Sequence, residues 1–452
     1  MNQQSSVTGK QVTVLGSGRS GRAVSNLLVR SGAAVFLSDC HRMDAQTRRW
    51  CHQRGIDYEE CGHTEAVLQA DFVVISPGVP SSDGFVQQAL AMDIPIYSEL
   101  EVASWYAPGG PVIAITGTNG KTTTASLIAH MLNTSHRSSV LAGNIGTPLS
   151  EHVLDLDSDT VIVLEVSSFQ LDHVDSFRPD VSVLLNITSD HLDRYDGHFE
   201  HYAQSKLRIY ENQSTQDVVV YNYDDTLVRK QVEFFTSTSD VQGLPFSCQV
   251  ELSQGADALR DRIRLQEKVL MSIDDLQLHG PHNVSNSLAA ALAGQSVGLN
   301  DATLCKSLRE FGGIDHRLEV VRRIEGVTYI NDSKATNVDA LKYALSSFSS
   351  PIVLLAGGRD KGNDYEVIKP LIQSKVHTLI TFGESAPKML QELGPYTDLA
   401  MASSTLDDAT RQAHQNARQG DVVLLSPACS SLDQYSSYEE RGAVFRHIVE
   451  EF

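Results

Sequence analysis

Short apolar runs alternate along the chain with polar, glycine-containing loops and with stretches in which apolar residues follow a helical spacing. Continuous apolar runs of this length are typical of strands whose two faces are both covered by helices. Such strands, alternating with helices, predict an α/β protein built on parallel sheets. The runs that we interpret as strands are 11–15, 34–37, 72–76, 113–116, 160–164, 181–186, 327–330, 352–356 and 422–425.

Two breaks divide this pattern into three parts. Residues 106–111, rich in proline and glycine, predict a linker, and the pair Gly312-Gly313 marks a second boundary. Between these breaks, residues 212–280 alternate short β-like runs with polar turns, and an alanine-rich helix then extends to about Val297. We therefore predict a Rossmann-like N-terminal domain, a central P-loop ATPase-type α/β domain and a Rossmann-like α/β C-terminal domain, over residues 1–108, 109–313 and 314–452.

The loop that follows the run at 113–116 has the composition of a nucleotide-phosphate site. Glycines let backbone N–H groups converge on phosphate oxygens, and the N-terminus of the following helix attracts negative charge. Lys121 adds a cation for the β- and γ-phosphates, and the Thr122 hydroxyl can hold Mg²⁺. A strand, a glycine-rich loop and a helix occur in the required order, which favours ATP binding over a plain turn. The residues of this loop are Gly117, Thr118, Asn119, Gly120, Lys121, Thr122 and Thr123.

A second glycine-rich loop follows the first strand. It reads Gly16-Ser-Gly-Arg-Ser-Gly21, and the acidic Asp39 comes after the next strand. This is the arrangement of a dinucleotide-binding fingerprint, so taken alone it predicts an NAD enzyme.

The composition limits the classes of partner. The chain has 452 residues, 41% of them hydrophobic, with 36 Lys plus Arg against 56 Asp plus Glu, a net charge of −20 and a pI near 5.2. An acidic balance disfavours nucleic acid as the main partner. The six cysteines are scattered without metal-ligand spacing, which is typical of reduced thiols. We find no signal peptide and no run approaching the roughly 20 apolar residues of a membrane span. We therefore expect a cytoplasmic protein without membrane insertion.

Side chains that could bind a metal ion follow two further strands of the central part. Glu165 comes after the run at 160–164, and His191 follows the run at 181–186. Beside a phosphate loop, a carboxylate and an imidazole at neighbouring strand ends could hold Mg²⁺. A lone glutamate at a strand end is more often a helix cap. Lys206 and Asn283 have ordinary interpretations too, as a surface lysine and as a helix N-cap.

Seven motifs occur together along the chain, in this order: Gly117–Thr123, Glu165–Gln170, Asp190–Asp193, Gly280–Asn283, Asp315–Arg317, Asn331–Asn337 and Gly357–Gly362. Taken together they resemble the Mur ligase family, most closely its branch that adds D-glutamate. The resemblance extends through essentially the whole chain.

The resemblance implies ATP-dependent ligation of D-glutamate to UDP-N-acetylmuramoyl-L-alanine, in cytoplasmic synthesis of a peptidoglycan precursor. The alanyl carboxylate would attack ATP to give an acyl phosphate, and the D-glutamate amine would displace phosphate through a tetrahedral intermediate. The protein would be a monomer. Sister ligases and folylpolyglutamate synthases share the acyl-phosphate route, but we find no Asp-Asn-Pro-Arg signature, and Asn119 stands where alanine-adding relatives usually carry His. An NAD oxidoreductase would leave Lys121, Glu165 and the third domain unexplained, and a nucleotide-gated binding protein would not need paired metal ligands together with a third α/β domain.

The resemblance also assigns roles to single residues. The catalytic residues would be Lys121, Glu165, His191, Lys206 and Lys334. Two Mg²⁺ ions would be held by Thr122, Glu165, His191 and Lys206, the last as a carbamate. ATP would contact the phosphate loop together with Asn283, Arg317 and Asp332. The UDP end of the substrate, rather than NAD, would contact Gly16, Ser17, Gly18, Arg19, Ser20, Asp39 and Gly78. Asn144 would lie near the acyl phosphate, and D-glutamate would contact Thr336, Lys361, Ser431 and Tyr438, where relatives often carry Phe at the last position.

Overall fold

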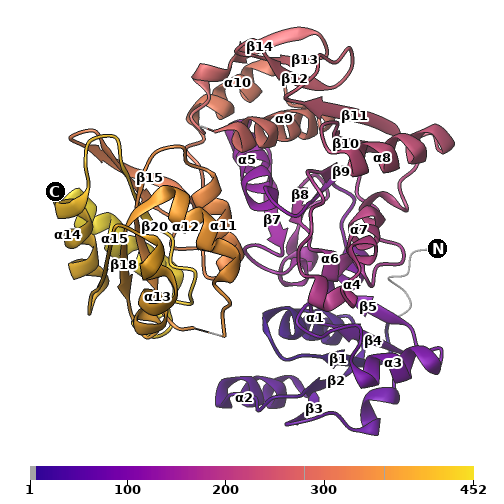
Figure 1. Cartoon of the computed structure of the whole chain (residues 1–452). Coiled ribbons are helices and arrows are strands. Elements are labelled where there is room, and N and C mark those ends of the chain that lie inside the picture. The colour runs from indigo at the N-terminus through magenta and orange to yellow at the C-terminus, as the bar shows by residue number, and fades with distance from the viewer. Residues whose placement is uncertain (1–6, 279, 361) are drawn as a thin grey trace. The chain divides into compact units, whose positions relative to one another are not determined.

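A computed structural model describes residues 7–278, 280–360 and 362–452. The chain forms two compact units, one ending at Phe311 and one beginning at Gly312 (Figure 1). The first unit contains two sheets and the second unit contains one. The three predicted domain ranges, with boundaries at 108/109 and 313/314, stay predictions.

The N-terminal sheet has five parallel strands in the order β3-β2-β1-β4-β5. Helices cover both faces, because α1 and α4 share one apolar core and α3 packs into a second. The strands are β1 Gln11–Leu15, β2 Ala34–Asp39, β3 Asp57–Glu60, β4 Phe72–Ile75 and β5 Ile96–Ser98. The helices are α1 Arg19–Arg30, α2 Ala45–Arg54, α3 Gly84–Ala91 and α4 Glu99–Ser104.

The central sheet has nine strands in the order β14-β13-β12-β11-β10-β9-β6-β8-β7, with antiparallel pairing only at β12-β13-β14 among the described strands. The strands are β6 Val112–Thr116, β7 Ser139–Gly143, β8 Val161–Glu165, β9 Val181–Leu184, β10 Val218–Asn222, β11 Gln242–Ser247, β12 Ala256–Leu259, β13 Arg262–Leu265 and β14 Lys268–Ser272. The helices are α5 Lys121–Thr134, α6 Ser168–Leu171, α7 Phe199–Leu207, α8 Thr226–Thr238, α9 Pro281–Ser296 and α10 Asp301–Glu310. Helix α9 packs along α5 and strands β9 to β12.

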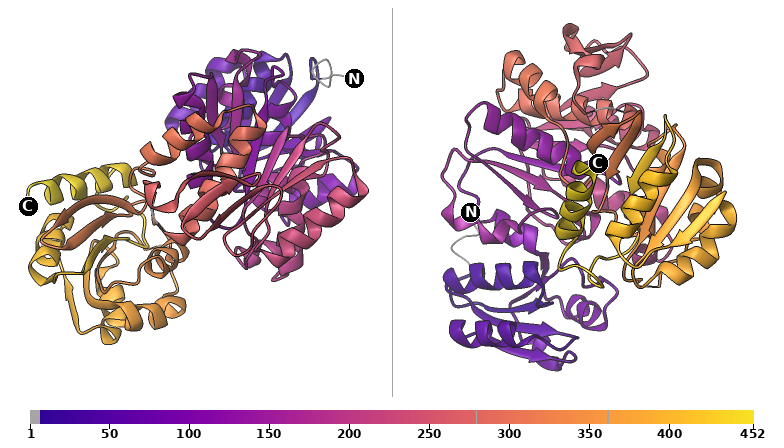
Figure 2. Two further views of the ribbon diagram at one scale, coloured as in Figure 1. Left: turned by 90° about the horizontal axis from the view of Figure 1, so that it is seen from above. Right: turned by 90° about the vertical axis from the view of Figure 1, so that its left-hand side faces the viewer.

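The C-terminal sheet has six strands in the order β15-β16-β20-β17-β18-β19, parallel except for the β15-β16 pair. Alternate residues of its strands enter two separate cores, so helices α11 to α13 cover one face and α14 and α15 the other (Figures 1 and 2). The strands are β15 Glu319–Ile324, β16 Val327–Asn331, β17 Ile352–Gly357, β18 Val376–Phe382, β19 Leu399–Ala402 and β20 Val422–Leu425. The helices are α11 Val338–Ser346, α12 Lys369–Lys375, α13 Ala386–Leu393, α14 Leu406–Asn416 and α15 Tyr438–Glu450.

Each strand predicted from an apolar run is present, with ends shifted by up to two residues. The largest shifts are two residues, in β2, which ends at Asp39 rather than at 37, and in β9, which ends at Leu184 rather than at 186. Strands β3, β5, β7, β15, β18 and β19 were not predicted; in β7, for example, the half-buried edge sequence Ser139–Gly143 has no continuous apolar run. In the part of the chain that the structure describes, no helix combines the length and the apolar character needed to cross a bilayer.

Candidate functional site

The predicted phosphate loop connects β6 to α5 and depends on two glycines. Gly117 has φ 154° and Gly120 has φ 87°, both in the region that favours glycine. A Cβ atom at Gly120 would lie 2.4 Å from Oδ1 of Asn286 on α9. The loop can therefore keep this shape only with glycine at position 120.

Asn186, which follows β9, fastens the same loop. Its Oδ1 accepts from the Asn119 N–H at 2.8 Å, and its Nδ2 donates to the Asn119 carbonyl at 3.1 Å. Its backbone carbonyl also accepts from the Thr118 N–H at 2.8 Å. These bonds hold the loop in a fixed conformation. This role could not be predicted from the sequence, because a polar residue after a strand is ordinary in a loop.

Two lysines meet at one carbonyl of the loop. The Lys121 Nζ donates to the carbonyls of Gly117 and Thr118, each at 2.8 Å, and the Lys206 Nζ on α7 donates to that of Gly117 at 3.0 Å. Lys206 is only 2% exposed. Burial, reinforced by the positive charge of Lys121, lowers the pKa of Lys206 well below its ordinary value. The structure therefore brings two lysine amines to one carbonyl and disfavours the charged form of the buried one, although Lys206 lies 85 positions beyond Lys121.

Glu165, the last residue of β8, is buried with one oxygen satisfied. Its Oε1 accepts from Asn144 Nδ2 at 2.8 Å, and the Asn144 N–H donates to the Glu165 carbonyl at 2.8 Å. Its Oε2 has no hydrogen-bond partner among the described residues. A buried carboxylate oxygen without a donor is costly, so the site suits a cation. Thr122, at the start of α5, is buried as well.

His191 has the left-handed φ of 50° and an accessible ring. Its Nε2 lies 3.5 Å from Oδ2 of Asp190, and the edge of its ring packs on Phe169 at a centroid distance of 5.3 Å. Half of the side chain is exposed. The imidazole can therefore reach a ligand without rearrangement of the core.

In the N-terminal glycine-rich loop, Ser17 binds Asp39 through both its N–H at 2.7 Å and its hydroxyl at 2.6 Å. Burial would raise the pKa of Asp39, but these bonds and the His41 N–H outweigh it and lower that pKa. Arg19 forms a two-pronged ion pair with Glu151, at 3.0 Å and 3.2 Å. Gly18 and Gly78 are exposed, and Ser20 is half-buried.

The second unit places its predicted residues at the strand ends of its own sheet. Asp332 is buried and accepts from the Ser426 hydroxyl at 2.8 Å and the Leu318 N–H at 3.2 Å. Burial, opposed by the Ser426 bond and by the charge of Arg317, raises the pKa of Asp332 to about 7.

The predicted D-glutamate contacts belong to the same unit. The Lys334 Nζ lies 5.9 Å from the ring centre of Tyr438. Ser431 is buried and Thr336 is exposed. Lys361 lies outside the described residues. Asn283, in the first unit, is half-buried, and its Oδ1 accepts from Asn286 Nδ2 at 3.4 Å.

The comparisons with known proteins cover all three parts of the chain. Residues 11–84 match the family described as MurD N-terminal domain, residues 115–294 match Mur ligase middle domain, and residues 316–429 match Mur ligase, glutamate ligase domain. The NAD interpretation of the first glycine-rich loop is therefore not supported.

Two relatives show how far the similarity extends. The chain is 48% identical to a protein of Salinibacter ruber named UDP-N-acetylmuramoylalanine–D-glutamate ligase, over 97% of each chain. It is 42% identical to a protein of the same name from Chloroherpeton thalassium, over 98% of each chain.

Solved structures resemble the fold. The UDP-N-acetylmuramate–alanine ligase of Thermotoga maritima matches with a TM-score of 0.56 and 19% identity, covering 98% of this chain and 99% of that one. A MurF structure from Acinetobacter baumannii matches with a TM-score of 0.58 and 17% identity, covering 93% and 86%. At this identity the similarity concerns the fold alone, and it confirms the predicted three-domain α/β architecture. Given the matches to all three of its domains and the nearly full-length relatives, this chain belongs to the Mur ligase family.

Proposed function

We propose that this protein uses ATP to join D-glutamate to UDP-N-acetylmuramoyl-L-alanine, releasing ADP and phosphate. One observation carries the proposal: a phosphate loop on whose Gly117 carbonyl Lys121 and the buried Lys206 converge, in a chain related over 97% of its length to D-glutamate ligases. The reaction would take place in the cytoplasm, in peptidoglycan precursor synthesis, and the enzyme would act as a monomer.

The phosphate loop would position ATP for attack. Its N–H groups would bind phosphate oxygens, and Lys121 would neutralise the β- and γ-phosphates. We propose that Asn283 contacts the adenine, Asp332 the ribose, and Arg317 the ADP phosphates. Asp332, with its raised pKa, could donate or accept near neutral pH, which suits a ribose hydroxyl.

The acidic and hydroxyl groups near the loop fit magnesium. Glu165 offers the unpaired Oε2, Thr122 offers a buried hydroxyl, and His191 offers an accessible ring. Bound Mg²⁺ would neutralise the phosphate oxygens. We propose two ions, one held by Thr122 and Glu165 and the other by His191.

The buried amine of Lys206 fits a carbamate. Carbon dioxide reacts with an uncharged amine, and burial favours that form by lowering the pKa of Lys206. The product is an anion at the end of a long side chain, close to the cation of Lys121. We propose that carbamylated Lys206 serves as a metal ligand.

The chemical step needs ATP because a carboxylate is inert toward an amine at neutral pH. A carboxylate oxygen of the alanyl group would attack the γ-phosphorus, and ADP would leave. The D-glutamate nitrogen would then attack the carbonyl carbon, lose a proton, and expel phosphate together with that oxygen. Asn144, held by Glu165, would hold the acyl group, and Lys334 would neutralise charge at the reacting end.

The UDP end of one substrate and the second substrate, D-glutamate, would bind in different units. The UDP end would contact Gly16, Ser17, Gly18, Arg19, Ser20, Asp39 and Gly78 in the first unit. D-Glutamate would contact Thr336, Lys361, Ser431 and Tyr438 in the second unit.

The test is a substrate panel. The purified protein would be incubated with ATP, Mg²⁺, UDP-N-acetylmuramoyl-L-alanine and one of D-glutamate, L-glutamate, L-alanine or diaminopimelate, while phosphate and product mass are followed. Turnover with D-glutamate alone supports the proposal. Turnover with a different amino acid would assign the protein to a sister reaction, and no turnover with any would refute ligation.

A further inference from the structure

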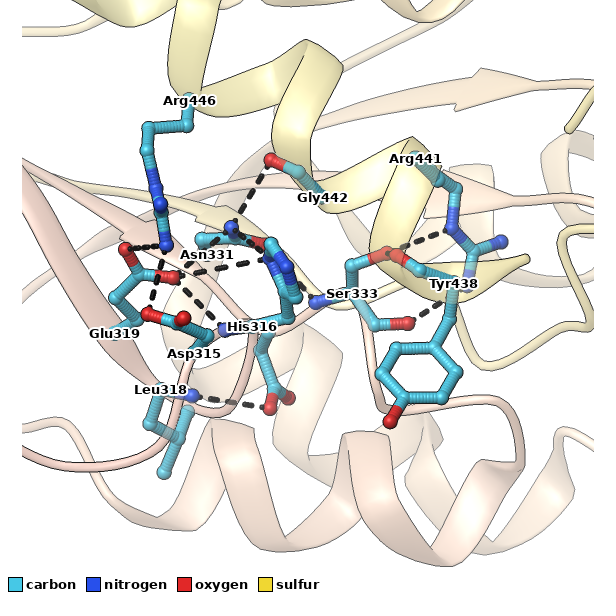
Figure 3. A network of polar contacts seen from close by, with 11 residues as sticks. Asp315, His316, Leu318, Glu319, Asn331, Ser333, Tyr438, Arg441, Gly442 and Arg446 are labelled. Carbon is cyan, nitrogen blue, oxygen red and sulfur yellow. Dashed lines mark hydrogen bonds and ion pairs between the residues drawn. The ribbon is translucent and has the colours of Figure 1, made fainter. Parts of the chain in front are cut away.

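Arg441, on α15 of the second unit, is fully buried, and three of its four hydrogen bonds go to backbone carbonyls. Figure 3 shows its bonds to Ser333. Its Nε donates to the Ser333 hydroxyl at 3.0 Å, and its Nη2 donates to the Ser333 carbonyl at 2.8 Å. Its Nη1 donates to the Cys429 carbonyl at 3.1 Å, with a longer contact of 3.5 Å to that of Gly357. One side chain therefore joins three separate chain segments.

Those three segments are the loops at the carboxyl ends of β16, β20 and β17. The loop after β16 carries Lys334 and Thr336, and the loop after β20 carries Ser431. Ligands of open α/β sheets bind at this edge, so Arg441 lies underneath the loops to which the D-glutamate contacts are assigned. No motif in the sequence marks this arginine, because its partners lie between 12 and 108 positions away.

The hydrogen bonds of Arg441 require the planar guanidinium group of an arginine. Among the described residues, no carboxylate oxygen lies within ion-pair distance of Arg441, and burial lowers its pKa to about 10. A planar fork with five N–H groups can reach several carbonyls at once, whereas the three donors of lysine radiate from one atom. Gly358 leaves the necessary space, because a Cβ atom there would lie 3.1 Å from the Arg441 Nη1.

The start of α15 is fastened to the same edge by further bonds. The Ser333 hydroxyl donates to the Tyr438 carbonyl at 2.8 Å, and Asn331 Nδ2 donates to the Gly442 carbonyl at 3.1 Å. A Cβ atom at Gly442 would lie 2.2 Å from Nδ1 of His316. The helix is therefore a rigid base from which Arg441 extends.

We infer that Arg441 is a positioning residue for D-glutamate: it sets the relative places of the loops after β16 and β20 without touching the substrate. This inference rests on the proposed function. If the fork is lost, the loops keep their sequence but lose their common anchor, so the affinity for D-glutamate should fall. The UDP end, assigned to the first unit, should be unaffected.

The experiment compares Arg441→Lys with Arg446→Lys in steady-state kinetics. Arg446 lies on the same helix and pairs with Asp315 and Glu319, but it bonds to none of the described residues of the three loops. For Arg441→Lys we expect the KM for D-glutamate to rise about tenfold or more, since small misplacements of binding groups have large effects. The KM for UDP-N-acetylmuramoyl-L-alanine should stay within about twofold, and Arg446→Lys should behave as wild type.

A second variant covers a possible failure of Arg441→Lys to fold, which urea unfolding would show. Ser333→Ala keeps the cation and removes one anchor, so the KM for D-glutamate should rise less, about threefold. An unchanged KM for D-glutamate in a folded variant would overturn the inference, as would equal rises for both substrates. If the wild-type protein itself does not use D-glutamate, the proposed function fails instead.

Discussion

Glu101 is the most heavily bonded carboxylate that the structure describes, and its replacement gives a sharp stability prediction. It lies on α4, is fully buried, and accepts five hydrogen bonds. Oε1 accepts from the Trp105 indole at 2.7 Å and from the N–H and hydroxyl of Ser176 at 3.0 Å and 2.5 Å. Oε2 accepts from the N–H groups of Asp175 and Phe177 at 3.0 Å and 2.8 Å. The N-terminal sheet is thereby joined to a loop of the central part.

The change Glu101→Gln removes one acceptor oxygen in either orientation of the amide. With the amide oxygen at the Oε1 position, the new NH₂ group faces the N–H groups of Asp175 and Phe177. In the other orientation it faces the three Oε1 donors. Two buried donors left without an acceptor cost about 1–3 kcal/mol each, so we expect a loss of roughly 2–6 kcal/mol.

The neighbouring Glu99 provides a matched control on the same helix. It is equally buried, but it accepts from the Ser150 N–H, and its Oε2 has no partner in the described part of the chain. Burial raises the pKa of Glu99, which favours the neutral acid that glutamine imitates. We therefore expect Glu99→Gln to change stability by less than about 1 kcal/mol.

The assay is urea unfolding followed by tryptophan emission. Both tryptophans, Trp50 and Trp105, lie in the N-terminal part, so the signal reports on that region alone. With a slope of about 2 kcal/mol per molar urea, Glu101→Gln should lower the midpoint by roughly 1–3 M. Equal midpoints for the two variants would refute the assignment of the stability to the five hydrogen bonds.

Three further changes test the site and the second unit. In CO₂-free buffer, the unfolded chain binds more protons at Lys206 than the folded chain does, between the lowered pKa of the folded state and about 10.5. Burial of this lysine therefore costs the most stability at low pH. Lys206→Met should therefore be more stable than wild type at pH 7, and the urea midpoints of the two proteins should converge as the pH approaches about 10.5. A difference between the two midpoints that does not change with pH would contradict this. Gly120→Ala should raise the KM for ATP about tenfold or more, because the new methyl group would collide with Asn286. Gly298 has a similar φ of 89° but open space around it, so Gly298→Ala should leave that KM unchanged. Equal KM values for the two variants would count against the collision. Gly442→Ala should lower the melting temperature of the second unit by collision with His316, measured by calorimetry, and an unchanged temperature would show that the ring can move away.

The sequence predicted those features that depend on local pattern. The strand at 422–425 and the phosphate loop are each specified by neighbouring residues, because apolar runs and glycine spacing act over short distances. The loop could not reveal its fastening by Asn186, which comes from another strand end.

The long-range partners of buried polar groups could not be predicted. Lys206 has no local feature that separates it from a surface lysine, and its depressed pKa follows from packing against a loop 89 positions earlier. Glu101 and Arg441 likewise bind segments that are about 75 and 108 positions away. Only the folded chain shows which charged residues are buried and what satisfies them.

Oxygen transfer from the substrate carboxylate tests ligation through an acyl phosphate most directly. UDP-N-acetylmuramoyl-L-alanine with ¹⁸O in its alanyl carboxylate would be incubated with the protein, ATP, Mg²⁺ and D-glutamate, and the released phosphate analysed by mass. With both carboxylate oxygens labelled, we predict one ¹⁸O atom in each phosphate and a product that has gained one glutamate residue and keeps the other ¹⁸O atom in its new amide. Phosphate without ¹⁸O, formed while the product accumulates, would contradict the acyl-phosphate route.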